Sequence, residues 1–417
     1  MNYDKILVEL GEFGPWQVII ALLLWLPLIL DGWVTMTASY TALAPEAYRC
    51  NIPGCDGPQF EFSDFNKQKM FPSLDQASTE FSPDKPNFCR YYKPLILDNG
   101  TCSQEFSSDI LECGSSSSFA HDQDTFIMNS TLVTEFTMLC DVNKQVWITM
   151  INNCFMVGLG IGGFVFGVLS DKLGRRHSLL IATILCSGGS LLESFMPNYW
   201  SYAITRILVG AGSEGCYLVA FTMSVEIVGI REHVPGLKWV SWTTFQGNII
   251  LVPFALGEIM VSLAAMVIHR WRDLELALSL MGLMFAFIWF FIPESPRWLI
   301  SQGDFEKAFA VILTAAKKNG VRLSGEVFKD DDDESEKIGQ FIHYGVLDIF
   351  NSSVIKNSLA LFICWPVDTL LYYGLTFSAD KIHLTSNTFL SFIIVGLVEI
   401  PSSLFLILLI LSSCSPS

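Results

Sequence analysis

Eight long apolar runs divide this sequence, and they constrain its fold more than any other feature. Each is close to the 20 or so residues that a helix needs to cross the ~30 Å hydrocarbon core of a bilayer. None alternates with period two, and backbone polar groups in lipid must be satisfied within the segment, so each run is predicted to be a helix. The runs lie near residues 15–42, 146–169, 177–195, 200–225, 239–267, 273–293, 357–378 and 386–412.

Composition supports an all-α membrane protein. Only 16% of the residues are charged, against roughly 25% in soluble domains, and the mean hydropathy is +0.44. Most of the acid behind the net charge of −16 lies in two polar segments, 43–145 and 294–355. No basic patch with interleaved aromatic residues is present, so nucleic acid is not an expected partner. The first apolar run is too long for a signal peptide.

The polar segment 43–145 is predicted to be an extracellular, disulfide-rich and glycosylated loop. It contains two glycosylation sequons, at Asn99 and Asn129, and an even number of cysteines, which together are typical of an oxidising compartment. The sequence does not choose among the pairings, and free thiols in a cytosolic loop are the alternative. The cysteines are Cys50, Cys55, Cys89, Cys102, Cys113 and Cys140.

The second polar segment, 294–356, is predicted to be a cytoplasmic loop. It contains an amphipathic helix over 303–320 and an acidic run, "KDDDDESEK" (329–337), to which no function is assigned. Lysines and arginines follow the second and fourth runs, whereas the loop at 196–199 has none, so the positive-inside rule places the N-terminus in the cytoplasm. The arginines of "HRWRD" (269–273) are an exception, because this topology places them outside.

The stretch "GVLSDKLGRR" (167–176) lies between the second and third runs and resembles the loop signature of the major facilitator superfamily at that position. Further motifs resemble the organic cation, carnitine and organic anion transporter family of that superfamily, and "YDKILVELGEFGPWQ" (3–17) is most similar to the cation and carnitine branch. The further motifs are "STLVTEFTMLCD" (130–141), "RILVGAGSEG" (206–215), "ESPRWLI" (294–300), "LYYGL" (371–375) and "GLVEIP" (396–401).

The resemblance implies a fold of twelve helices in two six-helix halves. Residues 1–293 then form a complete N-terminal six-helix bundle, and 357–417 supply two helices of an incomplete second half. Four helices of the family pattern are missing, so the resemblance indicates a C-terminally truncated member of the family.

Charged residues at membrane depth are costly and are therefore functional candidates. One group is expected to serve as structural and gating residues, with contact to solute as the alternative; for the arginines of the 167–176 turn, the simplest alternative is a topology anchor. This group consists of Gly167, Asp171, Gly174, Arg175, Arg176, Arg206, Glu214 and Glu226. Glu399 is expected to be structural, and Glu258 is assigned no role.

A second group is expected to bind substrate. Trp365, Asp368 and Tyr372 share one helical face by their spacing, and aromatic faces attract quaternary ammonium groups. Asp31 lies in the first helix, which the resemblance implies is cavity-lining. The alternatives are that the carboxylates pair with buried hydroxyls or lysines, and that the aromatic rings face lipid.

The sequence has no nucleotide-binding motif, no zinc-protease motif and no histidine spacing typical of a metal site, so we expect neither an enzyme nor a cofactor. The expected function is carriage of organic cations or carnitine-like zwitterions across the plasma membrane by alternating access. A co-transported Na⁺ or H⁺ and a homo-oligomer are further expectations. The alternatives are an organic anion carrier and a non-transporting relative that binds a full-length carrier.

Overall fold

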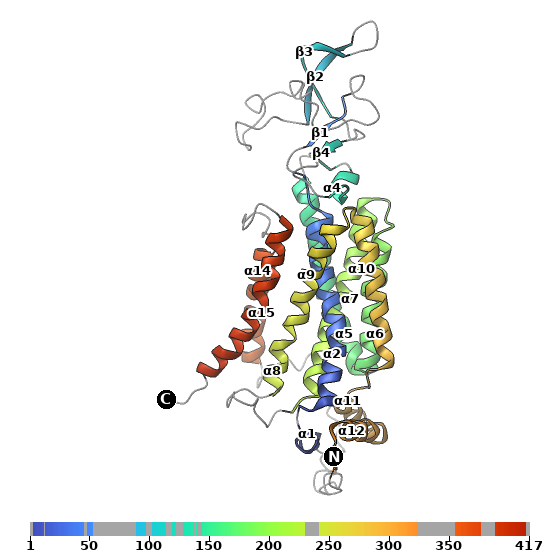
Figure 1. The fold of residues 1–417 in the computed structure, drawn as a ribbon, viewed down its shortest axis with the longest axis vertical. Coiled ribbons are helices and arrows are strands. Elements are labelled where there is room, and N and C mark those ends of the chain that lie inside the picture. The colour runs from blue at the N-terminus through green and yellow to red at the C-terminus, as the bar shows by residue number, and fades with distance from the viewer. Residues whose placement is uncertain are drawn as a thin grey trace.

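Helices coincide with all eight apolar runs in the computed structural model of this chain (Figure 1). They are α2 (Pro15–Thr41), α5 (Lys144–Leu173), α6 (Arg175–Glu193), α7 (Tyr199–Glu226), α8 (Trp242–Ile249) with α9 (Leu251–Val267), α10 (Trp271–Phe285) with the 3-10 helix η2 (Ala286–Phe290), α14 (Ile355–Thr376) and α15 (Thr388–Ser413). The structure describes residues 3–11, 13–45, 48–52, 89–96, 102–113, 119–121, 128–136, 138–139, 144–229, 242–323, 355–376 and 388–413.

Six of these helical segments, within the described residues, are long and apolar enough to cross a membrane. The two others are marginal for separate reasons: α6 has 19 residues and begins with Arg175, Arg176 and His177, and α15 contributes a shorter apolar stretch, Phe389–Ser403. The run at 239–267 is divided at Ile250. Pro253 accounts for this break, because a proline removes one helical hydrogen bond and its ring crowds the carbonyl four residues earlier.

The helices pack closely through small residues. α5 packs along α7, and α2 packs along α9. Gly158 of α5 faces Gly210 of α7 so closely that a Cβ added to Gly158 would lie 3.0 Å from the Gly210 Cα. This contact is typical of helix packing in membranes, because lipid supplies little hydrophobic drive and backbone proximity maximises van der Waals contact.

The part of segment 43–145 that the structure describes lies beyond one end of the helix bundle (Figure 1). Strand β1 (Tyr48–Cys50) pairs antiparallel with β4 (Phe119–His121), and β2 (Arg90–Ile96) pairs antiparallel with β3 (Cys102–Glu112). A short helix, α4 (Leu132–Glu135), follows them.

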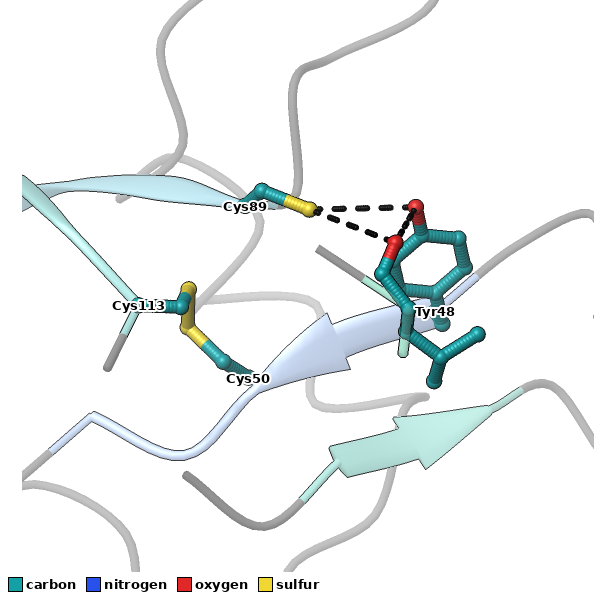
Figure 2. The surroundings of a disulfide bond; sticks show 5 residues. Tyr48, Cys50, Cys89 and Cys113 are labelled. Atoms are coloured by element: carbon teal, nitrogen blue, oxygen red, sulfur yellow. Dashed lines mark hydrogen bonds between the residues drawn. A yellow bond between two sulfur atoms is a disulfide. The ribbon is translucent and has the colours of Figure 1, made fainter. Parts of the chain in front are cut away.

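A disulfide joins Cys50 to Cys113 and so links the end of β1 to the residue after β3 (Figure 2). It confirms the expectation of disulfide bonding for these two cysteines. Nearby, the Tyr48 hydroxyl donates to the Leu139 carbonyl at 2.8 Å, and the Cys89 Sγ lies 3.7 Å from that hydroxyl. Desolvation by burial raises the pKa of Tyr48. Cys55, Cys140 and Asn99 lie outside the described residues, and Cys102 begins β3.

Helix α4 is fixed to the start of α10. The Glu135 carboxylate accepts from the Trp271 indole at 2.6 Å and from the Arg272 Nε at 2.9 Å. Arg272 also donates to the carbonyls of Ser194 and Met196, at 2.7 Å each. Arg272 therefore has a structural use at this end of the bundle, which accounts for one of the two arginines that depart from the positive-inside pattern.

Three further helices lie at the opposite end of the bundle, where the N-terminus also lies (Figure 1). They are α1 (Tyr3–Leu10), α11 (Pro296–Ser301) and α12 (Phe305–Asn319). Helix α12 is the amphipathic helix that the sequence predicts. Asp304 caps its first turn, and hydrogen bonding to Lys307 lowers the pKa of that carboxyl. The acidic run and the sequon at Asn351 lie outside the described residues.

Asn319, the last residue of α12, holds the junction between α1 and α2. Its Oδ1 accepts from the Trp16 backbone N–H at 2.9 Å. Its Nδ2 donates to the Leu10 carbonyl and to the Gln17 Oε1, each at 3.0 Å. One amide side chain thus satisfies backbone groups at the end of one helix and at the start of the next.

Candidate functional site

Arg175 is the centre of an ion-pair network at the end of the bundle that carries α12. Its guanidinium donates to the Asp171 carboxylate at 2.7 Å, to the Ser170 carbonyl at 2.7 Å and to Glu226 at 3.1 Å. The Asp171 side chain is 73% exposed, whereas those of Arg175 and Glu226 are each 11% exposed. The network joins the ends of α5, α6 and α7, and its Asp171 contact is the one most open to water.

Glu294 completes this network and was not singled out from the sequence. Its Oε1 accepts the Arg175 backbone N–H at 2.9 Å and the Arg176 backbone N–H at 3.2 Å. Acidic groups are favourable beside the unpaired N–H groups at a helix start, so Glu294 stabilises the first turn of α6. The motif that contains it, "ESPRWLI", was the available signal, but nothing in the sequence pairs it with residue 175.

Gly174 forms the turn between α5 and α6 with φ +99°, a conformation that favours glycine. A Cβ there would collide with the Glu294 carboxylate and approach the Trp298 ring to 3.2 Å. Arg176 stacks 4.2 Å above the Trp289 ring centre and donates to the Trp289 carbonyl at 2.9 Å. Gly167 makes only an ordinary van der Waals approach, with its added Cβ 3.9 Å from Leu218.

Arg206 lies apart from that network, buried between α6, α7 and α10. Its side chain is 1% exposed. Its guanidinium lies 3.1 Å from Glu275 and 3.6 Å from Glu193 and donates to the Tyr202 hydroxyl at 2.7 Å. Removing one partner of a buried pair leaves an uncompensated charge, so this cluster ties three helices together. The sequence pattern missed Glu193 and Glu275, which lie near the ends of apolar runs where charges are common.

Asp31 is buried in α2 and accepts a hydrogen bond from the Ser213 hydroxyl of α7. This arrangement matches the stated alternative that a membrane carboxylate pairs with a buried hydroxyl. Glu214, the next residue along α7, lies against Gly163 of α5. These two carboxyl groups are part of the helix interface rather than of the Arg175 network.

A cavity of about 1330 Å³ opens between the C-terminal end of α2, the N-terminal end of α5 and one side of α14. Apolar and aromatic side chains form most of its wall. Neutral polar side chains supply its hydrogen-bonding groups: Ser39, Thr149, Asn152, Asn153, Ser358, Thr369 and Tyr373. A space of this size exceeds that of a typical small-molecule site.

The three residues predicted to share a face of α14 have different surroundings in the structure. Trp365 lines the cavity. Asp368 is exposed and is not part of the cavity wall. Tyr372 is half-buried, and its hydroxyl lies 3.2 Å from the Glu258 carboxyl of α9 and 2.8 Å from the Glu399 carboxyl of α15. Glu258, to which the sequence assigned no role, is thereby a neighbour of the predicted site residue Tyr372.

Three carboxyl groups lie behind the cavity wall, on the side of Tyr373. They belong to Asp31, Glu214 and Glu258. Each of these acids lies on a different helix, α2, α7 or α9, so only folding brings them together. None of the three is among the described residues of the cavity wall; the aromatic rings in that wall, among them Trp365 and Tyr373, suit a solute with an organic cation.

Residues 102–411 match the sugar (and other) transporter family. The organic cation transporter protein of Drosophila melanogaster is 30% identical over 96% of this chain and 69% of its own length. Organic cation/carnitine transporter 2 of Homo sapiens is 29% identical, again over 96% of this chain and 69% of its own length.

Solved structures of the xylose transporter XylE of E. coli have a similar fold. A double tryptophan mutant aligns with a TM-score of 0.56 and 17% identity, over 95% of this chain and 69% of that chain. XylE bound to a bromo-deoxy-glucose, described as a major facilitator proton:xylose symporter, aligns with a TM-score of 0.52 and 16% identity over 94% of this chain and 68% of that chain. At such identity the likeness establishes the major facilitator fold alone.

Proposed function

The chain belongs to the sugar (and other) transporter family, and from that membership we propose that it carries organic cations or carnitine-like zwitterions across the plasma membrane. Its relatives are transporters and not enzymes, and two of them are named for organic cations and for carnitine. The observation that carries the solute class is the cavity wall that contains the aromatic rings of Trp365 and Tyr373.

Trp365 and Tyr373 are the aromatic groups proposed to face the ammonium centre of the solute. An aromatic face contributes about 0.5–2 kcal/mol to binding of a cation, the larger value applying when the site is desolvated. Neutral polar groups such as Asn152 and Asn153 line the same space and suit the carboxylate of a zwitterion. Asp31 and Asp368 remain proposed sources of negative charge, and their substitution tests whether either one selects cations.

The proposed mechanism is alternating access about this cavity. Helices α2 and α5 line one side of it, and α14 lines another. Relative movement of these elements would open the cavity to one face of the membrane at a time. The proposed gating contact is the ion pair between Asp171 and Arg175, because the exposure of Asp171 lets water replace its partner at low cost.

Uptake by cells that express the chain tests the proposal. The probes are radiolabelled tetraethylammonium, carnitine and para-aminohippurate, with surface expression measured in parallel. We expect uptake of one or both of the first two above that of mock-transfected cells. Uptake of para-aminohippurate alone would make this an anion carrier, and no uptake by chain present at the surface would favour a non-transporting role.

A further inference from the structure

Three side chains from three helices meet at one point beside the cavity. The Tyr372 hydroxyl of α14 lies 3.2 Å from the Glu258 Oε1 of α9 and 2.8 Å from the Glu399 Oε1 of α15. Glu258 is 3% exposed, and the other two side chains are half-buried. We call this group the carboxyl–tyrosine bridge. It lies at the interface between α9, which belongs to the first six apolar runs, and the two helices α14 and α15, which follow the polar segment 294–356.

Counting hydrogens shows that the bridge needs one more proton than ionised carboxylates provide. A phenol carries one hydrogen, so Tyr372 donates to only one of its two carboxyl neighbours. With both carboxylates ionised, the remaining contact would bring two lone pairs together. A protonated carboxyl at that contact donates to the phenol oxygen instead, and both short contacts become hydrogen bonds.

The charged surroundings of the bridge favour the same state. The titratable groups around the bridge are Asp31 and Tyr40 of α2 and Tyr373 of α14. Glu214 of α7 lies beyond Tyr373 and interacts with that tyrosine. Helix α8 has no titratable residue, and Glu275 of α10 faces Arg206 instead. No lysine or arginine therefore faces the bridge from the described helices. Two adjacent carboxylates without a cation repel each other, and a shared proton removes that repulsion.

We propose that the carboxyl–tyrosine bridge is a proton-binding site that couples transport to a proton. With the proton bound, Glu258 joins α9 to α14 and α15 through Tyr372. When the proton leaves to water, Glu258 and Glu399 are both anionic and repel each other, so the interface between these helices loosens. Tyr373 lines the cavity and lies ring to ring with Tyr372 at 5.1 Å, which places the bridge one residue from a route to water.

Infrared spectroscopy of the purified protein tests proton binding without any transport. At about pH 7 ordinary carboxyl groups are ionised, so a protonated-carboxyl band that shifts in D₂O reports buried groups. We expect Glu258→Gln and Glu399→Gln each to remove the same component of that band, because the two residues share one proton. Glu306→Gln, an exposed carboxyl on α12, is the matched control and should leave the band unchanged.

Two outcomes of the infrared measurement would overturn the site. If both glutamine variants keep the full band, the bridge holds no proton. If only one variant loses it, the proton belongs to a single carboxyl and is not shared. Tyr372→Phe separates the roles within the bridge: the carboxyl pair remains, so the band should persist at a shifted frequency, and its complete loss would contradict sharing between the two glutamates.

Coupling is the part that rests on the proposed function, and proteoliposomes test it. At one proton per solute and fixed membrane potential, a tenfold proton gradient sustains about tenfold accumulation of tetraethylammonium. We expect this stimulation in the parent chain and a ratio near unity in the double variant Glu258→Gln, Glu399→Gln. If the infrared band is present but the chain takes up no solute, the proposed function is contradicted and the proton site is retained. If gradient-driven uptake persists in the double variant, the coupling is contradicted and the carrier function is retained.

Discussion

Asp171 and Arg175 form an ion pair whose two ends differ in exposure, and this difference predicts its effect on transport. Asp171→Asn removes the charge and keeps an acceptor, so the turn should hold its shape while the pair weakens. Exposed pairs are worth up to about 1 kcal/mol, so we expect the maximal uptake rate to decrease by up to about fivefold. The half-saturating solute concentration should stay unchanged, because Asp171 does not line the cavity.

The matched control for that experiment is Asp304→Asn, which weakens an exposed pair with Lys307 on α12 and keeps the helix cap. Its maximal rate should equal that of the parent. A changed half-saturating concentration in Asp171→Asn, at an unchanged maximal rate, would indicate contact with solute instead of gating.

The conformation of Gly174 predicts that alanine at this position destabilises the protein more than alanine at Gly188, within α6. Gly174→Ala forces a side chain into positive φ and against Glu294 and Trp298, which should cost about 1–3 kcal/mol. Gly188→Ala, within α6, meets no atom within 4 Å and should be neutral or slightly stabilising. Thermal unfolding in detergent measures both. Equal melting temperatures for the two variants would show that the turn yields without strain.

Trp365 predicts the contribution of one ring to binding of a cation. Trp365→Ala should weaken inhibition of uptake by a quaternary ammonium by about 2–30-fold, and Trp365→Phe by less, because a ring face remains. Leu375→Ala, an exposed position of the same helix outside the cavity wall, is the control. The uncharged isostere of the inhibitor should be affected less than the cation. Equal losses for both compounds would assign Trp365 a packing role.

At the scale of elements, the Asn319 contacts predict how α1 depends on α12. Asn319→Ala removes three hydrogen bonds, which are worth about 0.5–1.5 kcal/mol each. The amides of residues 3–17 should then exchange with deuterium faster. Lys318→Ala, its exposed neighbour, should leave that exchange unchanged. Unaltered protection in Asn319→Ala would show that α1 is held by its apolar face alone.

The helices were predictable from the sequence because each follows from local hydropathy, and the major facilitator signature placed the turn at Gly174. The contacts between helices were not predictable in the same way. Spacing puts Trp365, Asp368 and Tyr372 along one side of α14, but which neighbour each side chain meets depends on α9, α15 and the cavity. Glu193, Glu258 and Glu275 acquire partners only through contacts between helices that are distant in the sequence.

At the scale of the whole molecule, Asn129 predicts the sidedness of the chain. It is exposed and shortly precedes α4, which lies at the end of the bundle opposite the N-terminus (Figure 1), and its backbone N–H donates to the His269 carbonyl at 2.8 Å. Glycosidase treatment of protein expressed in animal cells should increase its gel mobility. The double variant Asn99→Gln, Asn129→Gln should show no such change. A parent protein whose mobility does not change would place segment 43–145 on the cytoplasmic side.

The contacts of Asn319 form late during synthesis, after their partners have been made. Its partners Leu10, Trp16 and Gln17 precede it by about 300 residues. At roughly 5–20 residues per second, a ribosome needs about 15–60 s to make that stretch. For that period the start of α2 is inserted without its amide partner, and α1 has nothing of α12 to rest on. In the proposed topology, with the N-terminus in the cytoplasm, the nascent N-terminal segment is accessible to cytosolic factors until the chain has been translated past α12.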